Sequence, residues 1–240
     1  MPLTNLHPVS SHQAYLTLRD LEIKQSENPG LLTGNDLSGL APQKDVLVNS
    51  AFIGYGIDFR ENSIADIQAW YQQAGLAAFL TSNDLNLLTT YQANPTDANR
   101  QALINSFTHL PDEQAAARLL AAAVDARETP LNTRLGFVMP ESNERAALMS
   151  MFYNGGPGII GPKLLNALQG DDRAEAWYQI RYGSNADGDS SGSGLANRRY
   201  AESDKFGLYD GPDQNNAAPN QAEALAVMRM YTTHHEEIRA

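Results

Sequence analysis

The 240-residue chain contains no cysteine, which excludes disulfide bonds and metal sites built on thiolates. Basic side chains are also scarce, because 17 lysine and arginine residues stand against 28 aspartates and glutamates. The formal net charge of -11 argues against a nucleic-acid partner, which calls for clustered lysine and arginine. The same charge argues against adhesion to anionic membranes.

Long apolar runs are missing as well. No stretch approaches the ~20 apolar residues of a membrane-spanning helix, so we expect no membrane insertion. The first ten residues, MPLTNLHPVS, lack the basic start and apolar core of a secretory signal. If the substrate lies outside the cytoplasm, we therefore expect another device to carry the protein there.

Enough hydrophobic residues are present for a normal core, at 42% of the chain. A helix is expected at residues 11–27 and an irregular segment at 30–49. Apolar residues around two glycines predict a short strand with a tight turn at 51–59. From Ser63 onward, apolar residues recur at helical spacing almost to the end. The sequence therefore predicts a mainly helical α+β fold with one small β element near the N-terminus.

The length suits a single large domain. We expect a terminal helix at 221–239 that carries Leu225, Met228 and Tyr231 on one face. The subdivisions that we expect are a first helix with the β element at 10–62, a helical lobe at 63–209 and a C-terminal helical extension at 210–240.

Two carboxylates occupy positions from which side chains can face each other across a cleft. Glu27 ends the first expected helix, and Asp58 follows the glycine turn within residues 53–57. Hydrolysis of a glycosidic bond needs a carboxylic acid on one side, with a carboxylate or a held water on the other. Each signal also has an ordinary explanation. A charge at a helix end is usually solvated, and an aspartate after a strand often caps the next segment.

Four motifs follow one another along the chain: Glu27 at a helix end, FIGYGID at 52–58, FYNG at 152–155 and GLANRRYAE at 194–202. In this order they resemble the bacteriophage lysozyme superfamily, and within it the pesticin-like muramidases, over residues 16–208. The resemblance implies a lysozyme-like fold. It also implies hydrolysis of the β-1,4 bond between N-acetylmuramic acid and N-acetylglucosamine in peptidoglycan glycan strands. We expect a monomer without a cofactor.

By this resemblance Glu27 is the general acid and Asp58 the second acidic residue. Phage relatives instead place an aspartate nine residues after the glutamate, which is Asp36 here. We prefer Asp58 because it lies in the better-matched motif. The family threonine that helps to hold the attacking water is replaced by Phe52, whose side chain cannot bond a water. Ser50 lies on the same face of a strand, and we expect it to take over this role.

Three further residues are expected to bind substrate or to orient the acid: Tyr55, Asn154 and Arg199. No metal ion is expected. The segment that begins at Asp187 resembles the first half of a calcium loop, but Arg198 stands where such a loop needs a glutamate. The run His234–Glu237 is expected to be a solvated helix end, since adjacent helical residues do not face one site.

Two other functions stay open. A lytic transglycosylase uses one glutamate and needs no second carboxylate. A non-catalytic peptidoglycan-binding module is favoured by Phe52 in place of threonine. The missing secretory signal fits a phage endolysin and equally a toxin domain injected into the periplasm of a rival bacterium. The long polar loops and the acidic charge favour the toxin domain, for which a cognate immunity protein is an expected partner.

Overall fold

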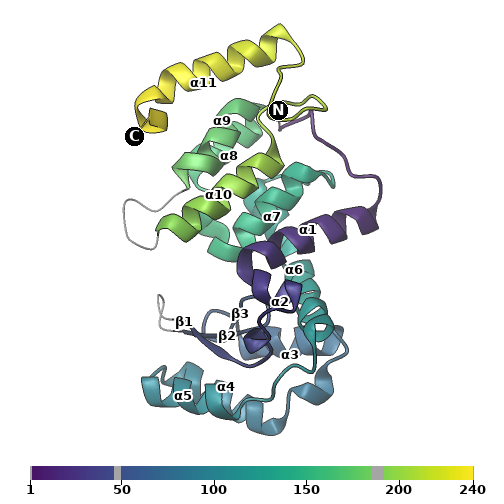
Figure 1. The fold of residues 1–240 in the computed structure, drawn as a ribbon, viewed down its shortest axis with the longest axis vertical. Coiled ribbons are helices and arrows are strands. Elements are labelled where there is room, and N and C mark those ends of the chain that lie inside the picture. The colour runs from purple at the N-terminus through teal and green to yellow at the C-terminus, as the bar shows by residue number, and fades with distance from the viewer. Residues whose placement is uncertain (1, 46–49, 185–191, 240) are drawn as a thin grey trace. The chain divides into compact units, whose positions relative to one another are not determined.

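The computed structural model describes residues 2–45, 50–184 and 192–239 (Figure 1). The helices are α1 His12–Glu27, α2 Pro29–Thr33, α3 Ile64–Gln73, α4 Ser82–Ala93, α5 Asp97–Ser106, α6 Glu113–Leu135, α7 Asn143–Gly155, α8 Pro162–Gln169, α9 Arg173–Tyr178, α10 Gly192–Phe206 and α11 Gln221–Arg239. The strands are β1 Gln43–Asp45, β2 Ser50–Ile53 and β3 Ile57–Asp58. The predicted mainly helical α+β fold with a small sheet near the N-terminus is confirmed.

The chain separates into two compact units. The helical unit comprises residues 1–22 and 127–240, and the mixed unit comprises residues 23–126. Helices α1 and α6 contribute residues to both. These bounds differ from the subdivisions expected at residues 62 and 209, and the single-domain organisation stays a prediction.

The sheet of the mixed unit is antiparallel in the order β1-β2-β3. Ile53 pairs with Ile57, and Phe52 pairs with Asp58. Because side chains alternate along a strand, Ser50, Phe52 and Asp58 share one face, while Ile53 and Ile57 lie in the core on the other. The pleat therefore places both β-strand candidates for the site, Ser50 and Asp58, on the same side of the sheet.

The segment 30–49 is more regular than the sequence predicts. Asn28 caps α2 by accepting a hydrogen bond from the backbone N–H of Leu31 at 3.0 Å, and Pro29 occupies the first helical position. An asparagine cap followed by proline is a standard helix start. A five-residue helix is too short to show a hydrophobic period, so the prediction of an irregular segment is wrong here, as it is for β1.

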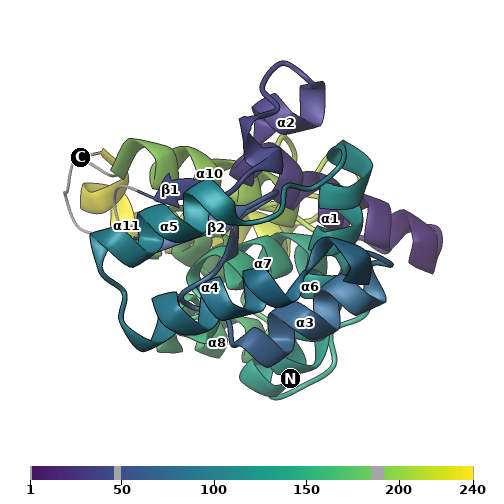
Figure 2. The same cartoon turned by 90° about the horizontal axis from the view of Figure 1, so that it is seen from below.

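Helices complete the mixed unit, where α4 and α5 pack against each other; Figure 2 views both from below. Ser63 caps α3 by accepting a hydrogen bond from the backbone N–H of Asp66 at 3.1 Å. Helix formation from Ser63 onward is thus confirmed. Among the described residues, no helix is both long and apolar enough to cross a bilayer.

In the helical unit, α7 is buried on all sides from Glu144 to Tyr153. A helix apolar or buried all round belongs in the centre of a core, as the sequence predicts for this segment. It packs against α10, which carries the Arg-Arg-x-x-Glu motif.

Helix α11 packs on α9 through a side other than the predicted stripe. Leu225, Met228 and Tyr231 do share a face, but they are 48%, 64% and 44% exposed. Met230 is buried instead, and the His234 ring stacks on Tyr178 at 3.6 Å between centroids. His234 is therefore a packing residue, in contrast to the solvated helix end that the sequence predicts.

Candidate active site

The carboxyl group of Glu27 lies against the Gly54–Gly56 turn. Gly56 has a φ of +82°, and a Cβ atom built on it would lie 2.8 Å from Oε2 of Glu27. Real Cβ atoms do not approach other atoms so closely, and a positive φ disfavours any residue with a Cβ. Glycine is therefore required here on both counts. The structure thus brings together the first two sequence motifs, the glutamate at a helix end and the glycine turn.

We expect Gly56→Ala to lower wall-lytic activity about tenfold, because the new methyl group must displace the general acid from a geometry that proximity catalysis depends on. The left-handed backbone should also cost about 1–2 kcal/mol of stability. Gly75→Ala is the matched control, since Gly75 has a φ of +69° but nothing within 4 Å of the place that a Cβ atom would occupy. Both variants are compared in turbidity assays on purified cell walls and by chemical unfolding. Equal activity of the two variants would contradict the assignment of Gly56.

Asp58 is held by three donors that converge on one oxygen. Its Oδ1 accepts hydrogen bonds from the Ser50 hydroxyl at 2.9 Å and from the backbone N–H groups of Arg60 at 2.6 Å and Glu61 at 2.8 Å. The carboxylate therefore closes the turn after β3, which is the capping explanation considered from the sequence. It is also fixed in orientation, as a catalytic carboxylate needs to be.

Ser50 is 1% exposed, and its hydroxyl proton points at Asp58. Phe52, which replaces the family threonine, lies directly opposite Asp58 in the strand register. On this face of the sheet, Asp58 therefore has the Ser50 hydroxyl as a hydrogen-bond donor and Phe52 as its neighbour on the adjacent strand. In this arrangement Ser50 acts first as a support for Asp58.

Asp36 occupies a different environment, on the exposed loop that follows α2. Its Oδ1 accepts a hydrogen bond from the backbone N–H of Ser38 at 2.8 Å. Hydrogen bonding from Ser38 lowers the pKa of Asp36 below its ordinary value. This local turn accounts for the residue without a catalytic role.

Tyr55 is fully buried, so its ring cannot stack on a sugar. Its hydroxyl donates to Oε1 of Glu113 at 2.6 Å. Burial, and then the hydrogen bond and charge of Glu113, raise the pKa of the Tyr55 phenol far above its ordinary value. Tyr55 thus supports the turn from within the mixed unit, and the expectation that it contacts substrate does not fit this position.

Asn154 and Arg199, both in the helical unit, are brought together. Arg199 is fully buried and donates to Oδ1 of Asn154 at 3.0 Å and to the carboxylate of Glu202. Arg198 donates to the other oxygen of Glu202 at 3.1 Å and to the backbone carbonyl of Ser150 at 3.0 Å. Arg199 is therefore a structural support, whereas Asn154 is exposed at the end of α7 and can meet a ligand.

The sequence predicts no role for Glu202. It follows Arg199 by three residues and Arg198 by four, and side chains at these spacings are neighbours on a helix surface. We expect Glu202→Gln to lower the free energy of unfolding by about 3 kcal/mol or more, because two buried arginines lose their counter-charge. Glu236→Gln, which alters an exposed pair with His235, should cost less than about 1 kcal/mol. Chemical denaturation of both variants measures the difference. A loss below about 1 kcal/mol for Glu202→Gln would contradict the role of this network.

Glu22 is the second glutamate to consider on α1. It is 7% exposed and lies 3.7 Å from Nζ of Lys205. Burial raises the pKa of Glu22 above its ordinary value, and Lys205 offsets this only in part. A raised pKa suits a general acid. However, five helical residues amount to a rotation of about 140°, so Glu22 and Glu27 leave α1 in different directions.

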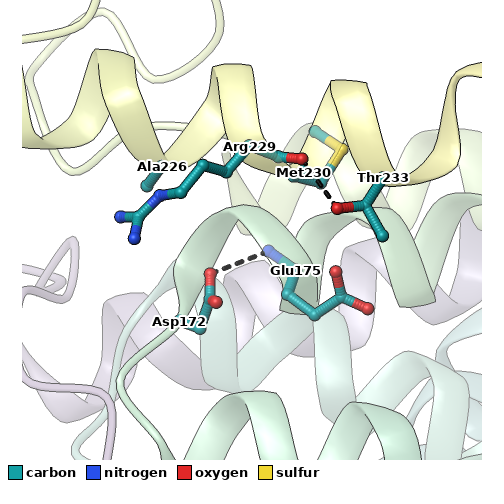
Figure 3. Close-up of a pocket in the computed structure, with 6 residues that line it drawn as sticks. All are labelled: Asp172, Glu175, Ala226, Arg229, Met230 and Thr233. Carbon is teal, nitrogen blue, oxygen red and sulfur yellow. Dashed lines mark hydrogen bonds between the residues drawn. The ribbon is translucent and has the colours of Figure 1, made fainter.

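A small hollow of about 140 Å³ lies between α9 and α11 (Figure 3). It is lined by Asp172, Glu175, Ala226, Arg229, Met230 and Thr233. Both carboxylates already have hydrogen-bond partners. Asp172 accepts a hydrogen bond from the backbone N–H of Glu175 at 3.1 Å, and the Glu175 carboxylate lies 2.9 Å from Nε2 of His234. The hollow contains none of the predicted site residues, and it offers no free acid–base pair.

The described part of the chain contains no group of three or more side chains that could hold a metal ion. The calcium-loop resemblance that begins at Asp187 lies outside the described residues.

Comparison with known proteins bears on the helices that follow the sheet. Residues 100–202 match the family model described as phage lysozyme. This range includes Asn154 and Arg199, while Glu27 and Asp58 precede it. No curated protein and no solved structure matches the chain. The matched range covers less than half of the chain and contains the last two of the four motifs. Together with the mainly helical α+β fold, the match supports the bacteriophage lysozyme superfamily and, in general terms, a peptidoglycan-lytic, lysozyme-like function.

Proposed function

We propose that the chain is a muramidase that hydrolyses the β-1,4 bond between N-acetylmuramic acid and N-acetylglucosamine. Glu27 is the general acid that protonates the leaving oxygen, and Asp58 is the second carboxylate. The observation that carries this proposal is the contact between the Glu27 carboxyl group and Gly56, two residues before Asp58.

The chain length between Gly56 and Asp58 supports the pairing. Two residues of extended chain span at most ~7 Å, so Asp58 starts within that reach of the backbone that Glu27 contacts. Carboxyl groups that flank a bond with a water between them lie ~6.5–9.5 Å apart in inverting enzymes. We propose that the carboxyl groups of Glu27 and Asp58 lie at this separation, so that Asp58 activates a water and the anomeric configuration is inverted.

The remaining candidates take supporting parts in this proposal. Ser50 holds Asp58 in place and, through its oxygen, is close to the water that Asp58 would activate. Within the helical unit, Arg199 fixes the Asn154 side chain, and Asn154 is the residue of that unit that we propose to bind peptidoglycan. Tyr55 supports the turn that carries Gly56.

A lytic transglycosylase is the second candidate, and one observation favours it. The three hydrogen bonds to Oδ1 give Asp58 a complete structural role as a turn cap. In that case Glu27 acts alone, first as acid and then as base, and the muramic acid hydroxyl attacks in place of water.

Purified cell walls test both candidates and the non-catalytic alternative. Loss of turbidity reports cleavage, and mass spectrometry of the fragments identifies the new ends. Hydrolysis leaves a reducing N-acetylmuramic acid, whereas a transglycosylase leaves an anhydro-muramic end. We expect reducing ends only. Binding to walls without any fragments would support a peptidoglycan-binding module and overturn the muramidase proposal.

We further propose that the protein acts in the periplasm of a target bacterium, carried there by a secretion system or by phage lysis machinery. Expression in a Gram-negative host with and without an added periplasmic signal tests this, because lysis should occur only with the signal. A toxin domain also predicts an immunity protein that neutralises it. An endolysin predicts none, so protection of the host by a co-expressed neighbouring gene distinguishes the two.

A further inference from the structure

Three side chains from three elements of the mixed unit meet beside the Gly54–Gly56 turn. They are Lys24 on α1, Tyr55 within the turn and Glu113 at the start of α6. Oε1 of Glu113 accepts hydrogen bonds from the Tyr55 hydroxyl at 2.6 Å and from Nζ of Lys24 at 3.0 Å. Nζ of Lys24 also lies 5.3 Å from the centre of the Tyr55 ring, within the range of a cation–π interaction. Each member of this cluster therefore contacts the other two.

The cluster is joined by the chain to both sides of the contact between Glu27 and Gly56. Lys24 precedes Glu27 by three residues on α1, a spacing at which side chains are neighbours on a helix surface. Tyr55 immediately precedes Gly56, the glycine that the Glu27 carboxyl group touches. A change in the cluster therefore needs to pass through only one turn of α1, or one peptide unit, to reach the contact between Glu27 and Gly56.

Helix α6 supplies the fixed support for this arrangement. Glu113 is its first residue, where a negative charge interacts favourably with the helix dipole. A Cβ atom on Gly54 would lie 3.5 Å from Cβ of Ala116 on the same helix, which is ordinary contact. The turn therefore rests on the first residues of α6 at two points, Gly54 and Tyr55.

The charges of the cluster are partly shielded from solvent. The side chains of Lys24 and Glu113 are 17% and 31% exposed, and Tyr55 is fully buried. Partial burial strengthens electrostatic interactions relative to water. The charged and titratable groups around the turn in the described mixed unit include this cluster, with Glu27 on α1 and Asp58 on β3.

We propose that Lys24, Tyr55 and Glu113 are positioning residues that lock the Gly54–Gly56 turn onto the end of α1 and balance the charge beside Glu27. The inference rests on the proposed function, because it assigns Glu27 as the general acid. Lys24 and Glu113 carry opposite charges, so their effects on the electrostatic potential at the turn oppose each other. Removal of either one alone leaves an unbalanced charge.

The two charge variants should move the pH profile in opposite directions. A general acid must be protonated, so activity falls as the pH rises through its pKa. Lys24→Met removes a positive charge, which should move this alkaline limb to higher pH by up to about 1 pH unit. Glu113→Gln leaves Lys24 without its counter-charge and should move the limb to lower pH. The double variant should return close to the wild-type profile, and Lys24→Arg should keep it.

The uncharged member of the cluster is tested by Tyr55→Phe, which removes only the hydroxyl bonded to Glu113. We expect kcat to fall about tenfold with little change in KM, because the reacting groups are misplaced while glycan binding is retained. Tyr71→Phe is the matched control. Tyr71 is equally buried in the same unit, and its hydroxyl has no hydrogen-bond partner within the described structure. Its activity should stay at the wild-type level.

The measurements are kcat and KM across pH on soluble peptidoglycan fragments, with unfolding curves to verify that each variant is folded. Opposite movements of the two single charge variants, restored in the double variant, support the inference. The inference is overturned if the alkaline limb of the pH profile does not shift in either single variant, or if it shifts in the same direction in both. If the wild type yields no cleavage products, or if Glu27→Gln remains active, the proposed function itself fails. That outcome is distinct from an active, Glu27-dependent enzyme that is indifferent to the cluster.

Discussion

Glu27→Gln is expected to abolish cell-wall lysis while it leaves the fold intact. Glutamine has the size and shape of glutamate, so it can occupy the same position against Gly56, but it cannot donate a proton to the leaving oxygen. Positioned acid catalysis contributes ~10²–10⁴-fold, and we expect a loss of that order. Turbidity assays on purified walls measure the loss, and an unchanged unfolding curve shows that the variant is folded.

The matched control is Glu22→Gln, on the same helix. Glu22 has the raised pKa that a general acid needs, yet it pairs with Lys205 and leaves α1 in another direction. We expect this variant to remain active. If Glu27→Gln instead keeps more than roughly a tenth of the wild-type activity, against the factor of ~10² or more that an acid contributes, Glu27 is not the acid. Glu22 then becomes the next candidate.

Asp58→Asn is expected to remove most of the activity, by about 10²-fold or more, whereas Asp36→Asn should have little effect. Asparagine retains a carbonyl oxygen that can accept the three hydrogen bonds now made to Oδ1, so the turn should survive. It loses the negative charge that activates a water. The same wall assay measures the loss of activity, and an unfolding curve shows whether the variant is folded.

Other results for the Asp58→Asn and Asp36→Asn variants would indicate other mechanisms. Loss of activity from Asp36→Asn alone would transfer the role to the loop after α2 and favour the phage-type arrangement. Full activity in both variants would favour the transglycosylase, which needs only Glu27. Ser50→Ala should lie between wild type and Asp58→Asn, because the backbone N–H groups of Arg60 and Glu61 still hold the carboxylate.

Several elements of the fold follow from local pattern alone. The helical spacing of apolar residues predicts α1, α7 and α11, and the glycine-interrupted apolar run predicts the strand and turn. These succeed because the period of a helix or a strand is set by backbone geometry. The motif order also indicates the lysozyme superfamily, since the four motifs lie at matching places along the chain.

Periodicity does not say which face of an element is covered. Leu225, Met228 and Tyr231 share a face of α11 as predicted, but that face is exposed, because α9 covers the side that carries Met230. Tyr55 was expected to meet substrate, yet it is fully buried. In each case the partner element is distant in sequence, and burial depends on that partner.

The sequence by itself determined the fold class, the positions of the long helices and the residue types available for glycan chemistry, because these depend on composition, spacing and backbone geometry. Only the tertiary structure decided that the Glu27 carboxyl group touches Gly56, that Arg199 is a buried support, and that Glu113 joins Lys24 to Tyr55. Lys24 and Glu113 are 89 residues apart in the chain. A hydrogen bond needs both partners within about 3 Å, and no local pattern contains the packing that brings such distant residues so close.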